Sequence, residues 1–365
     1  MAGDRLLAGF ESRVDPGRQH AVEAAMLHAA HRGEIRLHVS AIEGAALALG
    51  AHAPVPVPIA DAAGAVAFRR RTGGRPIACG DAFRLVTLAL PRRTSLLGDD
   101  AASIAPEQVM NRAVRGLQSG LRRLGLDPSY PGLDFVTVAG RSIAHLAFAE
   151  TDRGAVLFQA TLACEATLAE STRLLDRLDP GGVVPTTPIP PSTATSLGEL
   201  GVARGPAGPA GDGASGTTGA IRGLAPEALA RVFAASWAEP AGLAVVGADP
   251  PLGGEAAPDA AETDGPFPPA PAGTTVATAP SRLGIALAWA RAVDGRIEDA
   301  AVGGDVLARD GARARIARAL EGCATDRAAI GLVLDATLDR ERTWLLGVTP
   351  AELAGLLACA ARGDA

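Results

Sequence analysis

The sequence has 365 residues, of which 48% are hydrophobic but only 3% aromatic, so it is long enough for two ordinary domains with cores of small and aliphatic side chains. The formal net charge is −6, which disfavours a nucleic-acid-binding surface because such a surface needs a basic excess. None of the 34 basic residues is a lysine, which excludes a Schiff-base lysine, a lysine nucleophile and a P-loop in this chain.

The first half of the chain predicts helices interleaved with strands. Residues 15–32 are expected to form an amphipathic helix, with Asp15 as N-cap and Pro16 at the first helical position. Helical periodicity and apolar alternation predict the elements that follow: strands over 34–40, 62–71 and 79–91, a helix over 105–127, a hairpin over 134–150 that turns near Gly140, and a strand over 154–164. The strand in 79–91 is apolar on both faces, which is typical of a buried strand. Together these elements indicate a mixed α+β domain.

The composition changes in the second half. Residues 180–219 are rich in Pro, Gly, Ser and Thr, which predicts a loop-rich insertion, and a helix is expected over 224–237. Residues 249–275 are rich in Pro, Gly and Ala. This segment cannot bury enough apolar area to offset the entropy of ordering, so it is expected to be an exposed linker that proteases cut first.

The last ninety or so residues predict a second, smaller α+β domain. Strands are expected over 284–308, followed by two or three helices. The last helix begins with Thr349 as N-cap, and Glu352 completes a capping box. We therefore expect a domain over residues 1–248, the linker, and an accessory domain over 276–365.

Several kinds of site are disfavoured. The four cysteines form no Cys-x-x-Cys pair, so neither a zinc site nor a disulfide framework is predicted. His28 and His31 lie three residues apart on a predicted helix, but no cluster of Asp, Glu or Cys accompanies them, so we predict no metal site. No segment reaches eighteen uninterrupted apolar residues and no leader peptide is recognisable, so we expect a cytoplasmic protein without a membrane span.

Residues 68–80 (FRRRTGGRPIACG) carry the strongest candidate for a binding site. Three adjacent guanidinium groups repel one another, and the Gly73–Gly74 pair weakens any helix or strand that it interrupts. This combination is favourable where the backbone must approach an anion closely while forked donors hold it. Cys79 is a candidate nucleophile, but no histidine lies near it in the sequence, so a small buried residue is the favoured interpretation.

This loop and several other segments resemble, in order along the chain, the motifs of the lipoate–protein ligase A family, which is related to the biotin protein ligases. RRRTGGRPIACG is similar to the family's Arg-Arg-x-Ser/Thr-Gly-Gly loop, and DFVTVAGRSIAHLAF to its Gly-Arg-Lys-Ile-Ala-Gly hairpin. The matching segments are 19–39 with Glu23 in an acidic slot, 69–80, 134–148, 156–176, 193–200 and, for the accessory domain of the longer ligases, 295–323.

The resemblance implies a biotin/lipoate-ligase-like catalytic domain, with mixed sheets and flanking helices, followed by a small α+β accessory domain. It implies ATP with Mg, lipoate or octanoate as substrate, and as partner a lipoyl carrier domain of a 2-oxoacid dehydrogenase or glycine cleavage protein. It further implies that Arg70, as a solvated group with Arg69 behind it, contacts phosphate. The other residues implied to bind substrate or nucleotide are Thr72, Gly73, Gly74, Arg75, Ile77, Cys79 and Gln159.

The chain departs from the family where the chemistry is expected. The family's hairpin lysine, which binds the acyl carbonyl and a phosphate oxygen, aligns with Ser142. Such an ammonium group commonly contributes about 3–4 kcal/mol, and serine is too short to reach the same point without a water. Arg141 or Arg75 could supply the charge with a different geometry. Other family positions also differ: a glycine aligns with His145, a His-Asp pair with Cys79 and Gly80, an asparagine with Phe83 and a histidine with Gln159.

Two classes of function therefore compete. In the first, the chain activates lipoate or octanoate as an acyl-adenylate and transfers the acyl group to a carrier lysine, with Ser142 and Arg141 in the catalytic position. In the second, it is a catalytically inactive relative that binds a lipoyl domain or a partner ligase subunit. An octanoyltransferase that uses Cys79 is a third, weaker alternative.

Overall fold

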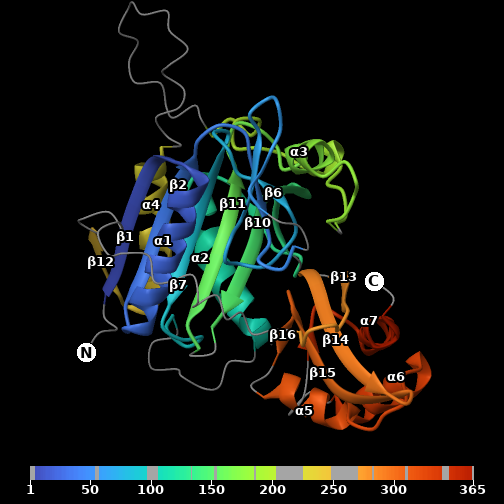
Figure 1. Ribbon diagram of the computed structural model, residues 1–365. Coiled ribbons are helices and arrows are strands. Elements are labelled where there is room, and N and C mark those ends of the chain that lie inside the picture. The colour runs from blue at the N-terminus through green and yellow to red at the C-terminus, as the bar shows by residue number, and fades with distance from the viewer. Residues whose placement is uncertain are drawn as a thin grey trace, which may run out of the picture.

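The computed structural model describes the following residues: 5–53, 57–96, 106–132, 134–151, 154–184, 186–202, 225–247, 270–281, 283–308, 311–338 and 345–363. Figure 1 shows a large sheet with helices on both faces, and a smaller sheet with its own helices beside one end of it. The mixture of sheets and helices confirms the predicted α+β class.

The main sheet has eight strands in the order β12-β1-β2-β7-β11-β10-β9-β8. The first two pairs in this order are parallel and the others antiparallel, so the sheet is mixed. In chain order the strands are β1 (Arg5–Val14), β2 (Ile35–Ile42), β7 (Phe83–Leu90), β8 (Pro128–Ser129), β9 (Phe135–Val138), β10 (Arg141–Glu150), β11 (Val156–Ala163) and β12 (Ala244–Gly247). Strand β7 is buried along its whole length, as its apolar pattern predicts.

Helices cover both faces of the main sheet. α1 (Pro16–His31) lies on the front face in Figure 1, and α2 (Pro106–Arg123) and α4 (Pro226–Ala238) lie behind it. The rear face is wholly apolar around Phe158 and Leu88. The front face is partly polar, because α1 and the strands beneath it bury Glu23 and His38. Asp15 caps α1 as predicted: its side chain accepts a hydrogen bond from the Arg18 N–H.

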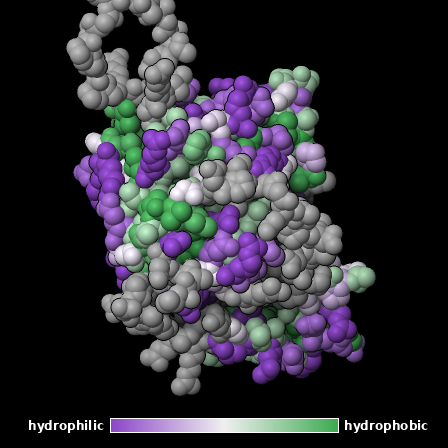
Figure 2. All heavy atoms as spheres, turned by 90° about the vertical axis from the view of Figure 1, so that its left-hand side faces the viewer, coloured by the Kyte–Doolittle hydropathy of each residue, from purple (hydrophilic) through white to green (hydrophobic). Residues whose placement is uncertain are grey.

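One edge of the main sheet is open among the described residues. Strand β12 is mostly exposed, and with β1 it presents two large apolar side chains, Phe10 at 42% and Val245 at 46% exposure. Figure 2 views the molecule from this side and shows hydrophobic atoms there among hydrophilic ones. Within the described residues, no helix is long and apolar enough to cross a membrane.

A second sheet of four strands lies beside the main one, in the order β4-β5-β3-β6. Its strands are β3 (Ala46–Leu49), β4 (Ile59–Ala60), β5 (Val66–Arg69) and β6 (Ile77–Ala78), and α3 (Glu170–Leu178) packs against it. The strand predicted over 62–71 is therefore shorter than expected. It ends at Arg69, so Arg70 and the double glycine lie in the loop between β5 and β6.

The C-terminal unit has its own core of alanine, leucine and isoleucine side chains. Its elements are β13 (Val276–Ser281), β14 (Gly284–Val293), β15 (Arg296–Gly304), β16 (Leu307–Ala308), β17 (Leu345–Leu346), α5 (Ala312–Leu320), α6 (Arg327–Thr337) and α7 (Pro350–Arg362). The predicted capping box is present: Thr349 and Glu352 exchange side-chain and backbone hydrogen bonds at the start of α7. Ile285 and Leu287, at the start of β14, belong instead to the core of the four-stranded sheet.

Two expectations about connecting segments fall partly outside the described residues. Of the predicted linker 249–275, only 270–275 is described, and of the insertion 180–219, residues 203–219 lie outside. The described part of the insertion is irregular apart from one 3-10 turn, Pro191–Thr193.

Candidate functional site

The loop between β5 and β6 lies where the two sheets, α1 and the C-terminal unit meet. Its backbone is anchored on two sides: Gly73 N donates to Phe148 O of β10 at 3.1 Å, and Ala51 N donates to Thr72 O at 3.0 Å. The loop is therefore a fixed part of the interior, with contacts to segments far away in the sequence.

A buried polar network holds the first part of this loop. The Glu23 carboxylate of α1 is fully buried and accepts hydrogen bonds from Arg71 N at 2.8 Å and from Gln159 Nε2 at 2.7 Å. Gln159 Oε1 in turn accepts from Thr72 Oγ1 at 2.7 Å. Gln19 extends the network by donating to Glu23. Thus Thr72 and Gln159, both expected in the site, lie together, and Glu23 joins them to the loop.

Arg70 lies inside the protein with an exposed fraction of 1%. Its guanidinium donates to three backbone carbonyl oxygens: Gly73 O from Nε at 3.0 Å, Ala48 O from Nη1 at 3.0 Å and Arg75 O from Nη2 at 2.9 Å. Burial lowers its pKa, and among the charged groups Asp305 opposes this shift most. The expectation that Arg70 is solvated is therefore wrong: a short loop folds back so that its own carbonyl groups surround the side chain.

The Arg69 side chain also donates hydrogen bonds to backbone carbonyl groups. Its Nη1 donates to Ala53 O at 2.7 Å and to Ala51 O at 3.0 Å, which fixes the turn after β3. Burial lowers the pKa of Arg69. Both arginines thus organise the backbone around the double glycine.

The two glycines are required for different reasons. A Cβ atom at Gly73 would lie 1.7 Å from Asp305 Oδ1 of the C-terminal unit, so any larger residue would have to displace this side chain. Gly74 has a φ of +94°, in the region that favours glycine. Its backbone is also approached by Gly284, where an added Cβ would lie 2.5 Å from Gly74 Cα. The close approach predicted for this pair is made by the C-terminal unit.

Arg75 begins a second polar cluster. Its Nε donates to Asp134 Oδ2 at 2.6 Å, its Nη1 donates to Thr187 O at 3.1 Å, and its guanidinium carbon lies 4.8 Å from the centre of the Phe135 ring. His145 Nε2 lies 3.8 Å from the same Asp134 oxygen and has no hydrogen-bond partner among the described residues. Burial lowers the pKa of His145 well below its usual value and raises that of Asp134, so the histidine is neutral.

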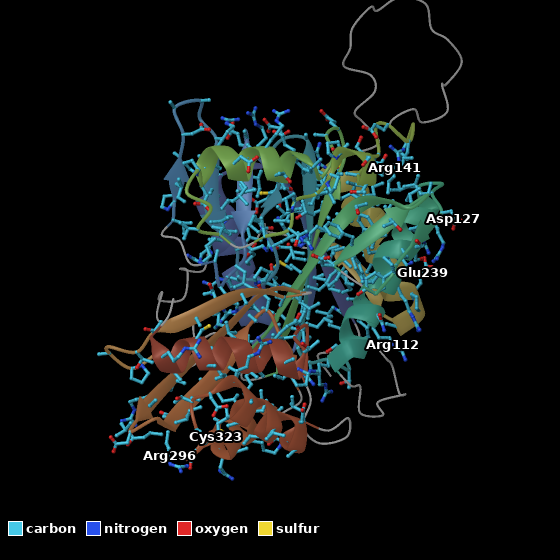
Figure 3. The ribbon with its side chains drawn as sticks, turned by 90° about the vertical axis from the view of Figure 1, so that its right-hand side faces the viewer. Arg112, Asp127, Arg141, Glu239, Arg296 and Cys323 are labelled. Atoms are coloured by element: carbon cyan, nitrogen blue, oxygen red, sulfur yellow. The ribbon has the colours of Figure 1, made fainter. Side chains whose placement is uncertain are left out.

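Ser142 and Arg141 lie at the start of β10, away from the double glycine. His145 is the residue of β10 beside Gly74, and Ser142 lies three positions before it, which is about 10 Å along an extended strand. Ser142 O accepts from Thr195 N at 2.9 Å, so the hairpin contacts the segment 193–200. Arg141 is 41% exposed and pairs with Glu199 at 3.3 Å. Figure 3 shows Arg141 at the periphery, on the same side of the molecule as Asp127.

Cys79 and Ile77 belong to the core of the four-stranded sheet. The Cys79 thiol is 1% exposed and burial raises its pKa to about 12, so it carries no thiolate at neutral pH. A nucleophilic role for Cys79, and with it the octanoyltransferase alternative that uses this residue, is not supported. Ile77 is fully buried in the same core, away from solvent.

No protein-family model matches the sequence, and no curated protein matches it. Among solved structures, P. falciparum LipL1 in complex with lipoate aligns at 12% identity with a TM-score of 0.51, over 92% of this chain and 96% of that chain. The chain has the biotin/lipoate-ligase-like fold.

Two further structures with this fold align less closely. Lipoate-protein ligase A bound with ATP aligns at 16% identity with a TM-score of 0.42, over 67% of this chain and 87% of that chain. Protein Ta0514 of T. acidophilum with bound lipoic acid aligns at 14% identity with a TM-score of 0.40, over 67% and 88%. The alignment with LipL1 covers 92% of the present chain, and the uncovered part is too short to contain the whole C-terminal unit.

Two residues of the site were not found from the sequence: Asp134 and Asp305. Asp134 directly precedes a hairpin strand, and a carboxylate at such a position is usually solvated. Asp305 lies more than two hundred residues after the loop that it contacts, so no local pattern could connect the two.

Proposed function

We propose that the protein is a lipoate–protein ligase-like enzyme, which activates lipoate or octanoate with ATP and Mg and transfers the acyl group to a lysine of a lipoyl carrier domain. The observation that carries the proposal is the buried network in which Glu23 and Gln159 hold the double-glycine loop against the main sheet. These residues stand at positions that resemble the family's motifs, in a chain with the corresponding fold. The lipoate, lipoic acid and ATP in the solved structures with this fold support the ligand classes.

Arg141 is the candidate for the positive charge that the family's lysine supplies. Arg75 is already held by Asp134 and by the Thr187 carbonyl, so its charge is neutralised where it lies. The Arg141 ion pair with Glu199 is exposed and long, and such pairs contribute little to stability, so the side chain can move at small cost.

The loop in its present arrangement does not fit a nucleotide phosphate. Arg70 donates to carbonyl groups that a phosphate oxygen would have to replace, and the carboxylate of Asp305 lies on Gly73, where it would repel an anion. Arg70 therefore has no role in the proposed reaction.

A catalytically inactive relative is the second candidate, and Ser142 in the lysine position favours it. The first test is to incubate the protein with Mg-ATP and octanoate or lipoate, and to detect acyl-AMP by mass spectrometry. An enzyme forms acyl-AMP and labels an added lipoyl domain; an inactive relative forms none but still retains the lipoyl domain in a binding assay.

Arg141→Ala tests which cation acts. If Arg141 supplies the charge, this variant should form acyl-AMP about 10²–10³ times more slowly, whereas the exposed Arg92→Ala is the matched control and should leave the rate unchanged. Ser142→Lys should raise the rate if no other cation takes the lysine's place. A parent that is already active and is slowed by Ser142→Lys would show that another group does so.

A further inference from the structure

The contact between Asp305 and Gly73 joins the C-terminal unit to the candidate site. Asp305 follows β15 directly, is 7% exposed and presents Oδ1 to Gly73, while Oδ2 accepts from Ile285 N at 2.7 Å. Oδ1 has no hydrogen-bond partner among the described residues. The Gly74 backbone lowers the pKa of Asp305 through a hydrogen bond, but a buried carboxylate with so few donors is costly, so its retention at this point needs a reason.

The charges around this carboxylate identify the surface that it occupies. Burial raises the pKa of Asp305, and His52, in the turn after β3, and Arg70 oppose that rise. Burial lowers the pKa of His52, and Arg313 and Arg69 lower it further, so the positive charge at this point comes from the arginines. The carboxylate therefore lies where positive charge and a glycine backbone without side chains converge. These are the features that favour an anion at the double-glycine loop.

At Gly73, the Asp305 side chain occupies the volume that a Cβ atom would need. The φ of Gly73 is outside the left-handed region, so the backbone would accept alanine there without strain. The atoms nearest to the added Cβ all belong to the Asp305 side chain, with Oδ1 at 1.7 Å and Cγ at 2.6 Å.

We propose that the Asp305 carboxylate is an internal anion that closes the Gly73 face of the double-glycine loop, so that an anionic ligand must displace it to bind there. The C-terminal unit thereby blocks this face of the loop against anionic ligands. The proposed function supplies the class of the displaced ligand, a phosphate-bearing nucleotide; the contact itself does not depend on it.

The first experiment tests the contact without any ligand. Gly73→Ala should lower the melting temperature by about 2–4 °C, because the new methyl group collides with Asp305. In the Asp305→Gly background, where the colliding side chain is absent, the same substitution should cost less than half of that loss. Gly247→Ala is the matched control, since nothing lies within 4 Å of a Cβ there and its φ allows alanine, and it should leave the melting temperature unchanged. Additive effects of the two substitutions would overturn the proposal.

The second experiment tests closure with Mg-ATP as the probe. By calorimetry, Asp305→Ala should bind ATP at least about tenfold more tightly than the parent, because the competing carboxylate is gone. Asp299→Ala, at an exposed position of β15, removes the same charge without touching the loop and should match the parent. Equal affinity of Asp305→Ala and the parent, including no binding by either, would overturn the proposal.

The outcomes separate this proposal from the proposed function. ATP binding gained in Asp305→Ala without any acyl-AMP supports the closure and contradicts the ligase activity. Acyl-AMP formed equally fast by the parent and by Asp305→Ala supports the activity and overturns the closure.

Discussion

Arg70 is buried because a short loop can satisfy a forked cation with its own carbonyl oxygens. Carbonyl groups of Gly73 and Arg75 turn inward around the guanidinium, and Ala48 completes the set from β3. Arginine suits this position better than lysine, since a planar fork reaches several acceptors at once and keeps its charge when buried. Here the charge organises the fold of the loop that carries it.

We therefore expect Arg70→Ala to destabilise the protein even without ligand. The substitution removes charged hydrogen bonds, each contributing about 1.5–3 kcal/mol, and leaves buried carbonyl groups without donors. Urea unfolding should show a loss of about 3 kcal/mol in the free energy of unfolding. Arg92→Ala, at an exposed position, should change it by less than about 0.5 kcal/mol. Equal stability of the two variants would mean that the Arg70 side chain lies in solvent.

His38 makes the stability of the main sheet depend on pH. It is 1% exposed, its ring nitrogens have no hydrogen-bond partners among the described residues, and burial lowers its pKa to about 4. Glu11, 3.8 Å away, raises the pKa in opposition, and Arg18 lowers it further. Because the folded pKa lies below the ordinary value of about 6.5, the neutral form is favoured on folding. The stability that this provides is complete above pH 6.5 and is lost as the pH falls toward 4.

His38→Gln should remove this pH dependence. Between pH 7.5 and pH 5 the parent should lose about 2 kcal/mol more in the free energy of unfolding than the variant. Urea titrations at several pH values measure the difference. The buried His145 acts in the same direction and remains in both proteins, so some loss should persist in the variant. Parallel pH profiles for the two proteins would show that folding leaves the pKa of His38 unchanged.

At the scale of elements, periodic patterns in the sequence predicted most of the helices, although α3 (Glu170–Leu178) was missed. The cap at Asp15, the capping box at Thr349 and the hairpin turn at Gly140 all depend on neighbouring residues, and all three are present. Strand β1 (Arg5–Val14) was missed because its apolar alternation is interrupted by Gly9 and by charged side chains. Its hydrogen bonds to β2, which no pattern within its own sequence indicates, hold it in the sheet. The burial of Arg70 was missed for the same kind of reason, since distant segments enclose it.

The packing of α2 on α4 depends on two glycines, Gly116 and Gly120. An added Cβ at Gly116 would lie 2.2 Å from the Trp237 ring, and one at Gly120 would lie 2.3 Å from the Phe233 ring. Trp237 Nε1 also donates to Ala113 O at 2.9 Å, which fixes the indole against α2. Two aromatic side chains thus fill the space that larger helix residues would take.

Alanine at Gly116 should therefore destabilise the protein, although alanine is the better helix former. Helix propensity favours the substitution by about 1 kcal/mol, but overpacking against a rigid ring costs about 1–3 kcal/mol and should prevail. Gly331→Ala in α6 is the matched control, because only the Ala354 methyl group lies within 4 Å, at 3.9 Å. Thermal unfolding should show a lower melting temperature for Gly116→Ala and an unchanged or higher one for Gly331→Ala. A gain at both positions would contradict the close packing of α2 on α4.

At the scale of the whole molecule, the C-terminal unit is joined to the rest by buried contacts. Ile285 is fully buried in the core of the four-stranded sheet, Leu287 packs beside it and Leu283 contacts the main core. Each such side chain contributes about 1.5–3 kcal/mol when buried. The sequence pattern could divide the chain near residue 276, but it could not show that residues just beyond this point complete the core of the preceding part.

These contacts should hold the two parts together after the chain is cut between them. A specific protease site engineered between residues 255 and 260 allows a single cleavage, and the two fragments should then co-elute in size-exclusion chromatography. Ile285→Asp places a carboxylate in the shared core and should separate the fragments, whereas Val293→Asp, on a side chain 47% exposed at the far end of β14, should not. Circular dichroism of the uncut proteins checks that both variants fold. Fragments of the parent chain that elute separately would mean that the buried contacts are too weak to join the two parts, and that the chain between them does so instead.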